Sequence, residues 1–432
     1  MGIQQLLLNS APPLTVGFLN ISYSTTTVLR ADSGISSFSF ITAAGIVASS
    51  CSDTAGGAYT RADVVAVAAT GTVAFALQQY SSAVANTILY SAYMQSATAV
   101  IGLYSSTGVG WLFVRSTSAG AANVRAFAAA QGVTAPSYFG SSSGTLAVVW
   151  RPTALKAIVG VLSSTLVPSW WREITPVTTS WYFIPMEVAA NPSYTALGAS
   201  CDVSVVGYHV PCLLLFGASG SLLWSYGFGP TAGGVSSYDT SATAMDASNN
   251  VYTAVNVVGV LYILKYAVSG VSAWVRSLSC PSFTLPGMQP QSSFCDAGGN
   301  FWICGRVVST TLLFKMSPTG TLLLSRQINA AVFIGYDSVL NQLVCSTTLL
   351  SSTSSKGAVV FRLPVDGSRT GTYTLDNFSF TYATLTASVA TTTLNAFNLS
   401  TYITVTTPTV TTTTPAVTTT APALTHAQTF AS

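Results

Sequence analysis

The chain has 432 residues and a net charge of +3, and only 6% of its residues are charged whereas 49% are hydrophobic. Its most apolar stretches, 64–77 and 211–224, are shorter than the roughly 18 unbroken apolar residues that a spanning helix requires. Its fifteen Lys and Arg residues are scattered and form no basic groove. We therefore expect neither a membrane span nor a nucleic-acid partner.

The composition favours an all-β fold. Val, Thr, Tyr, Phe and Trp recur throughout, and the helix formers Glu and Lys are nearly absent. A surface this poor in charge would be sticky if it were free in solution. We expect other proteins or sister subunits to cover much of it, and the alternative is a surface kept hydrated by Ser and Thr hydroxyls.

Residues 1–35 precede the first repeat. The opening, MGIQQLLLNSAPP, has no basic region and only a short apolar core, so it does not match a secretory signal. We expect the protein to be made in the cytosol, although its composition is typical of extracellular proteins. The alternating stretch at 14–30 predicts a closing strand or a docking arm.

Residues 36–377 contain a repeat of about fifty residues. Three segments, 213–228, 262–277 and 312–327, align without gaps, and each reads as two strands around a glycine. These glycines are Gly220, Gly270 and Gly320, and Trp224, Trp274 and Leu324 follow them. A tight hairpin favours glycine because the turn requires positive φ.

A second pair of strands precedes two of these hairpins, at 242–257 and 292–307. Asp246 and Asp296 open the intervening turns, where Asp and Asn are favoured. Each unit then has four short strands in meander order, which is one propeller blade. Weaker copies occur at 64–80 around Gly71, 99–116 around Gly108, 157–174, and 333–350 followed by 357–375. We predict a β-propeller with seven four-stranded blades; the alternative is a β-sandwich or two stacked β domains.

Residues 378–432 are dominated by Thr, with recurring Pro, and carry no charged residue. Alternating Thr and Val residues add readily to a sheet edge. We expect this tail to run as an extended β segment against a neighbouring subunit.

One segment brings acids, an arginine and aromatic residues together, and aromatic faces can bind sugar rings. The candidate glycan-stacking residues are Trp170, Trp171, Arg172, Glu173, Trp181 and Tyr182. The alternative is that Trp170 and Arg172 are the third-blade counterparts of Trp274 and Arg276. Glu187, also nearby, would be the second carboxylate of a glycoside-cleaving pair.

Other catalytic signals are weak. His209 and His426 are the two histidines, and no Cys, His and carboxylate spacing typical of zinc occurs. Residues 140–144 match GxSxG, but a strand-like segment follows where the nucleophile elbow requires a helix. We therefore expect no enzyme activity, no metal and no cofactor.

The repeat unit resembles the blades of propellers with SBBP-type or PQQ-type repeats, without implying the PQQ cofactor. The opening and the Thr-rich tail are similar to those of tail and tail-fibre proteins of tailed bacteriophages. This resemblance implies a structural virion protein that binds other tail proteins, forms a homo-oligomer and contacts a host-surface glycan. The alternatives are a bacterial surface adhesin or lectin-like propeller, and a polysaccharide-degrading enzyme.

Overall fold

A computed structural model describes residues 145–408 apart from gaps at 154, 179–181, 204–208, 230–240, 286–287, 338–340, 350–356 and 376–377. Outside this range it describes mainly strand backbone, between residues 22 and 142 and between 410 and 425. The described residues form 36 strands and one short 3-10 turn, η4 (Leu399–Thr401). The expected all-β fold is confirmed.

Six sheets each begin with four consecutive antiparallel strands. The first has β2 (Ser39–Ile41), β3 (Gly45–Thr54), β4 (Ala58–Val67) and β5 (Val73–Tyr80), and the second has β6 (Ile88–Ser96), β7 (Ala99–Ser106), β8 (Gly110–Thr117) and β9 (Gly120–Phe127). The third has β10 (Ala135–Ser142), β11 (Thr145–Thr153), β12 (Lys156–Leu162) and β13 (Pro168–Pro176). The fourth has β14 (Phe183–Ala190), β15 (Tyr194–Asp202), β16 (His209–Gly217) and β17 (Leu222–Phe228).

The fifth sheet has β18 (Ser241–Met245), β19 (Val251–Val257), β20 (Val260–Tyr266) and β21 (Ser272–Ser279). The sixth has β22 (Gln289–Cys295), β23 (Phe301–Val307), β24 (Thr310–Met316) and β25 (Leu322–Ile328). The seventh has three described strands, β26 (Phe333–Asp337), β27 (Gln342–Leu349) and β28 (Gly357–Pro364). We call the first strand of each sheet its innermost strand and the fourth its outer strand.

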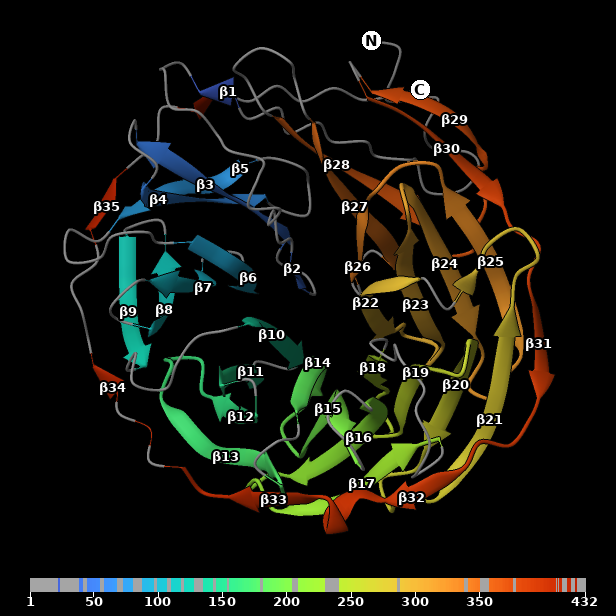
Figure 1. The fold of residues 1–432 in the computed structure, drawn as a ribbon. Helices are drawn as coiled ribbons and strands as arrows, with labels where there is room; N and C mark the ends of the chain where they lie inside the picture. The colour runs from blue at the N-terminus through green and yellow to red at the C-terminus, as the bar shows by residue number, and fades with distance from the viewer. Residues whose placement is uncertain are drawn as a thin grey trace.

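The sheets are arranged as a ring (Figure 1). Each innermost strand contacts the innermost strand of the next sheet, from β2 through β6, β10, β14, β18 and β22 to β26, and β26 contacts β2. Sheets that radiate from a shared axis define a β-propeller, so the predicted fold class is confirmed. That the propeller has seven blades of four strands each stays a prediction, because the seventh sheet has only three described strands.

The three central hairpins form as predicted. Gly220, Gly270 and Gly320 have φ values of 76°, 84° and 82° and lie in the turns between the third and fourth strands. In the third sheet Leu166 adopts positive φ in the corresponding turn, at 65°. The 64–80 segment, β4 and β5, also joins a third strand to a fourth.

Two of the weaker hairpins are assigned wrongly by the sequence. The 99–116 segment pairs β7 with β8, which are the second and third strands of their sheet. The 357–375 segment forms no hairpin, because β29 (Gly371–Leu375) pairs with β30 (Phe378–Thr384) in the sixth sheet. Leu375 and Phe378 are register partners, so this local pairing takes the segment that the seventh sheet was expected to use.

The Thr-rich tail is extended, as predicted, and its described strands pair with this chain's own outer strands. Its expected contact with a neighbouring subunit stays a prediction. We call strands β30 to β36 the belt (red, Figure 1). It passes the sixth sheet, then the fifth, and continues back to the first. The pairs are β30 with β25, β31 (Ser388–Thr391) with β21, β32 (Ala396–Asn398) with β17, β33 (Ile403–Thr406) with β13, β34 (Thr412–Thr413) with β9, β35 (Thr418–Thr420) with β5, and β36 (Leu424–Thr425) with β1 (Ser22–Tyr23).

Apolar side chains anchor the belt between the sheets. Leu399 and Ile403 are buried in a core cluster shared by the third and fourth sheets, and Leu385 is buried between the fifth and sixth. Asn395 donates from Nδ2 to the carbonyl oxygen of Gly229, which follows an outer strand. The belt thus covers sheet edges that would otherwise expose unpaired backbone groups.

Candidate functional site

The predicted aromatic cluster is split by strand geometry. Trp170 and Trp171 are neighbours on β13, so their side chains point to opposite faces of the sheet. Trp170 packs on Phe216 of the fourth sheet, with ring centroids 5.8 Å apart, whereas Trp171 packs edge-on against Trp150 at 4.9 Å. Each indole residue is only 8% exposed. Neither face is open for a sugar ring to stack on.

The other predicted site residues lie apart. Arg172 donates to the Ser219 carbonyl oxygen of the next sheet, at 3.0 Å. Glu173 accepts an ion-paired hydrogen bond of 2.8 Å from Lys156. Tyr182, just before β14 of the fourth sheet, packs edge-on against His209 on β16. Trp181 lies outside the described residues. The glycan-binding role stays a prediction for these six residues.

A repeated contact between neighbouring sheets explains Trp170 and Arg172 better. Arg276 donates to the carbonyl oxygens of Thr319 and Gly320 and lies over the Trp274 ring, as Arg172 lies over Trp170. The distances from guanidinium carbon to ring centroid are 5.6 and 5.9 Å. The alternative assignment, as third-blade counterparts, therefore fits the contacts.

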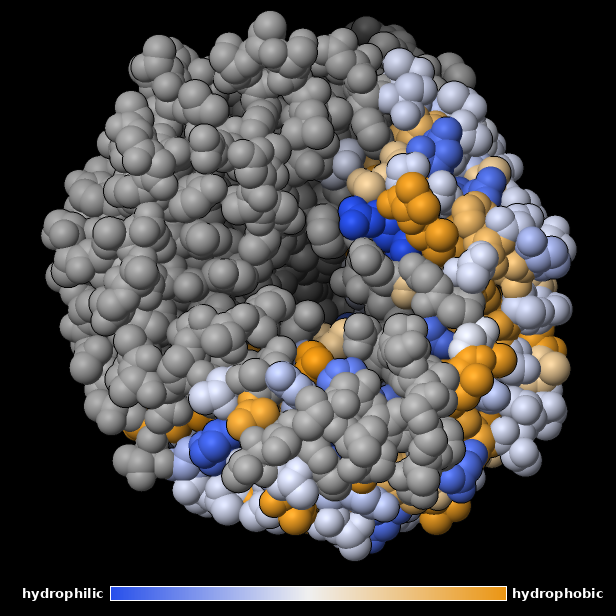
Figure 2. All heavy atoms as spheres, viewed as in Figure 1, coloured by the Kyte–Doolittle hydropathy of each residue, from blue (hydrophilic) through white to orange (hydrophobic). Residues whose placement is uncertain are grey.

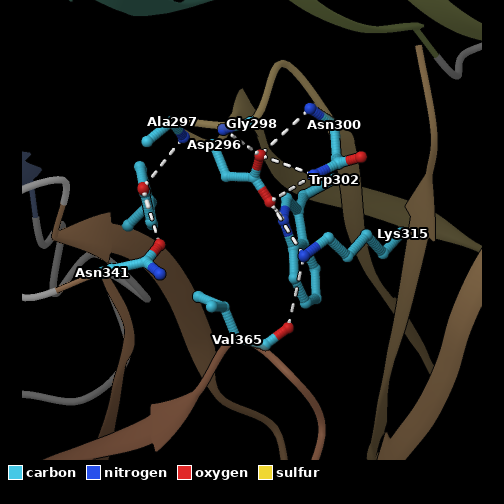
Figure 3. A network of polar contacts seen from close by, with 9 residues as sticks. Asp296, Ala297, Gly298, Asn300, Trp302, Lys315, Asn341 and Val365 are labelled. Atoms are coloured by element: carbon cyan, nitrogen blue, oxygen red, sulfur yellow. Dashed lines mark hydrogen bonds and ion pairs between the residues drawn. The ribbon is translucent and has the colours of Figure 1, made fainter.

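Asp296 is the centre of a polar network in the first turn of the sixth sheet (Figure 3). Its Oδ1 accepts from the backbone N–H groups of Gly298 and Asn300, and Oδ2 accepts from Trp302 Nε1 and from Lys315 Nζ at 2.9 Å. Burial would raise the pKa of Asp296, but these donors together hold it below its ordinary value.

The fifth sheet repeats this network fifty residues earlier. Asp246 accepts from the N–H groups of Ser248 and Asn250 and from Tyr252 Oη. Lys265 lies over the Tyr252 ring at 5.0 Å, as Lys315 lies over Trp302 at 5.1 Å. The network recurs at the same repeat position, and donors of the turn bind the carboxylate oxygens of Asp246 and Asp296. We therefore interpret it as a structural contact that stabilises the turn, and we call Asp296 with its donors the Asp296 latch.

The axis of the ring carries a different acid. Among the seven innermost strands the only acidic residues are Glu187 and Asp337, and no Lys, Arg or His occurs there. Glu187 lies on β14 at a β-bulge, since the register with β15 shifts between Pro185 and Glu187. Figure 2 shows that the molecule is hollowed at this centre.

Glu187 joins three sheets. Its Oε2 accepts a 2.6 Å bond from Thr243 N on β18 and a 2.9 Å bond from Ser293 Oγ on β22, and Oε1 accepts from Ser293 N at 3.2 Å. Burial raises the pKa of Glu187 to about 7, against the lowering effect of these three donors. Sequence reasoning had placed Glu187 only beside the aromatic cluster.

Two further groups could carry chemistry. His209 Nδ1 lies 2.6 Å from Asp202 Oδ1, and Asp202 Oδ2 accepts from the N–H of Tyr182. The six described cysteines carry free thiols, and burial raises the pKa of the Cys304 thiol to about 12. Within the described part of the chain, no three His, Cys, Asp or Glu side chains gather as metal ligands. Among the described residues there is also no helix with the length and hydrophobicity that a membrane span requires.

Comparison with known proteins adds fold similarities. No family model and no curated protein matches the chain. Drosophila plexin A, solved with semaphorin 1b, is 8% identical over 82% of this chain and 87% of that chain, with a TM-score of 0.43. A neuraminidase-like protein of A/little yellow-shouldered bat/Guatemala is 9% identical over 80% and 98%, at 0.36. A luciferin-regenerating enzyme is 15% identical over 62% and 88%, also at 0.36. These similarities carry no functional argument for this chain.

Proposed function

We propose that the chain is a structural virion protein of a tailed bacteriophage, a tail, fibre or tail-tip component that acts through protein–protein assembly and contacts the host surface. The observation that supports this most is the belt, which covers the outer edges of the propeller. Sheet edges left open invite uncontrolled pairing, and a covered ring suits a protein that must persist in a particle outside the cell. The resemblance of the two termini to tail proteins supplies the viral part of the proposal.

The arrangement of carboxylates supports a binding role over glycoside hydrolysis. A glycosidase needs two carboxyl groups about 5 to 9.5 Å apart across the scissile bond. Glu173 is on the outer strand of the third sheet and is paired with Lys156, whereas Glu187 is on the innermost strand of the fourth. The two acids therefore do not flank one gap among the described residues.

The virion role is tested with particles purified from the lysate of a culture that expresses this gene. We expect the chain to sediment with infectious particles through a density gradient, and an antibody against it to label the tail. Deleting the gene should give particles with defective tails. Normal, infectious particles without the chain would overturn the proposal.

Host contact needs its own experiment. The recombinant chain, added before the phage, should bind host cells and reduce adsorption. Trp181→Ala is the informative variant because Trp170 and Trp171 are occupied by packing. Trp274→Ala is the matched control, since it removes an indole from the fifth sheet, outside the six-residue cluster. Equal competition by parent and Trp181→Ala would remove Trp181 from the proposed host contact.

A further inference from the structure

The turns between the third and fourth strands have one geometry in four consecutive sheets. Each is closed by two backbone hydrogen bonds; in the fifth sheet, Ala267 N donates to the Val271 carbonyl oxygen and Gly270 N donates to that of Ala267. The extra residue of a β-bulge follows each turn. The turns lie side by side at one end of the ring, because Gly220, Gly270 and Gly320 pack on the outer strand of the preceding sheet. We call the turns with their bulge residues the turn rim, which comprises 163–169, 217–223, 267–273 and 317–323.

Each of these four sheets exposes one large apolar side chain on the turn rim. The exposed fractions are 49% for Val167, 47% for Leu223, 65% for Val271 and 53% for Leu323. The turn rim contains no Asp, Glu, Lys, Arg or His. Single exposed apolar residues are common on protein surfaces, whereas four of them at one end of consecutive sheets indicate an interaction surface.

The opposite end of the ring is uneven along the same sheets. A two-residue turn joins β19 to β20 there, whereas residues 203–208 separate the register partners Asp202 and His209 in the fourth sheet. The other exposed large apolar residues that the structure describes lie at this end; they are Val177, Val258 and Val308. These valines provide controls, because they are exposed and apolar but lie outside the turn rim.

The belt leaves the turn rim open. Its described strands pair with the far halves of the outer strands, from Tyr226 to Phe228 on β17 and from Arg276 to Ser279 on β21. In the third and sixth sheets the pairing likewise begins beyond the turn rim, at Glu173 and at Arg326. The side chains of the turn rim are therefore accessible to a partner.

The exposed residues alternate around the ring. In the third and fifth sheets the apolar residue is a valine at the last position of the turn, Val167 or Val271. In the fourth and sixth sheets it is a leucine at the bulge, Leu223 or Leu323. Because these sheets are consecutive in the ring, the order along the turn rim is Val, Leu, Val, Leu. The reversed order is Leu, Val, Leu, Val, so a reversed copy would place a leucine opposite every valine.

We propose that the turn rim binds the turn rim of a second copy of this chain across a two-fold axis. Two rings that face each other about such an axis run in opposite senses, and the axis would pass between the fourth and fifth sheets. Leu223 then faces Val271 of the second copy, and Val167 faces Leu323 of the second copy. Each contact occurs twice, as an isologous interface requires.

Two observations favour a second copy over a different partner. The turn rim carries no charge, so two copies meet without like-charge repulsion. Its exposed residues also complement themselves once their order is reversed. The four segments supply about the 20 to 30 residues per side that a stable interface uses. The inference does not depend on the virion role, because the isolated chain should form this dimer.

The test measures the mass of the isolated chain by sedimentation velocity over a range of concentrations. We expect the parent to show a monomer–dimer equilibrium. Leu223→Asp should raise the dissociation constant of the dimer by about tenfold or more, because its carboxylate would be buried against an apolar side chain. Val271→Lys should have a similar effect, and Val308→Asp, at the opposite end, is the matched control that should leave the dimer unchanged. All three substituted residues are exposed, so circular dichroism should show that the variants keep the fold.

Mixing two variants tests the two-fold arrangement. When Leu223→Asp chains meet Val271→Lys chains, the two new charges face each other and the second Leu–Val contact stays intact. The mixture should therefore dimerise more tightly than either variant alone. A mixture of Leu223→Asp with Leu323→Lys is the control and should show no gain, because these two positions do not face each other.

Three results would overturn the proposal. A parent that stays monomeric up to its solubility limit has no such interface, and this result would leave the virion role untouched. A dimer that Val308→Asp dissociates and Leu223→Asp does not would place the interface at the opposite end. A dimer that Leu223→Asp weakens, but that mixing with Val271→Lys does not restore, would contradict the two-fold pairing of the fourth and fifth sheets.

Discussion

The indole of Trp170 lies over Gly220 of the neighbouring sheet, so closely that a Cβ at position 220 would come within 2.6 Å of Trp170 Cδ2. The contact recurs around the ring, since a Cβ on Gly270 or Gly320 would lie about 3.0 Å from Trp224 or Trp274. The repeated glycine therefore serves two purposes. It permits positive φ in its own hairpin. Because it has no Cβ, it also leaves room for the large side chain of the preceding sheet.

Gly220→Ala separates these two purposes when it is compared with Gly259→Ala. Both glycines have a φ of 76°, but a Cβ on Gly259 would meet nothing within 4 Å. We expect Gly259→Ala to cost about 1 to 2 kcal/mol of unfolding free energy, the backbone cost alone. Gly220→Ala should cost clearly more, because Trp170 must move. Denaturant unfolding measures both, and equal losses would contradict the packing role.

The Asp296 latch predicts instability in acid. The folded pKa of this carboxyl is below its unfolded value, so its contribution is present above the unfolded value and is lost as pH falls through the folded one. We expect Asp296→Asn to reduce stability at pH 7, since Lys315 loses its charged partner. The parent should approach the variant as pH falls below about 4. Thermal unfolding between pH 3 and pH 7 measures the difference.

The sequence predicted the central blades because their signals are local. A hairpin needs only a glycine such as Gly270 between two apolar strands, and an Asp turn such as that at Asp296 is equally short-range. The sequence did not predict that the belt pairs with the chain's own outer strands, because these pairs are distant in sequence. Ile328 pairs with Tyr382 and Ser22 with Thr425, and an alternating Thr-rich segment does not encode which edge it joins.

The site was harder to predict than the fold. Trp170 and Trp171 are adjacent in sequence, but alternation along β13 sends them into different cores. The sequence offered one signal for Glu187, because it is an acid within an otherwise uncharged strand. Its donors, Thr243 and Ser293, come from two other sheets, and no local pattern could name them.

Glu187 predicts the opposite pH dependence to Asp296. Its pKa is raised from 4.5 to about 7 by burial, so the folded chain binds more protons than the unfolded chain between these values. Stability should therefore fall as pH rises through this range, by up to about 3 kcal/mol. Glu187→Gln should flatten the dependence and unfold at a higher temperature than the parent at pH 8. A parent profile that is flat between pH 5 and pH 8 would contradict the raised pKa.

The belt predicts a protease-sensitive tail when one anchor is lost. Leu399 is fully buried between the third and fourth sheets, whereas Ser400 next to it is exposed. We expect Leu399→Asp to detach this part of the belt, because an unpaired buried charge is costly, and Ser400→Asp to leave it bound. The tail carries no Lys or Arg, so chymotrypsin is the suitable protease, with Phe397 and Tyr402 as its sites. Cleavage there should be faster only in Leu399→Asp, and similar rates in the two variants would show that Leu399 does not hold the belt.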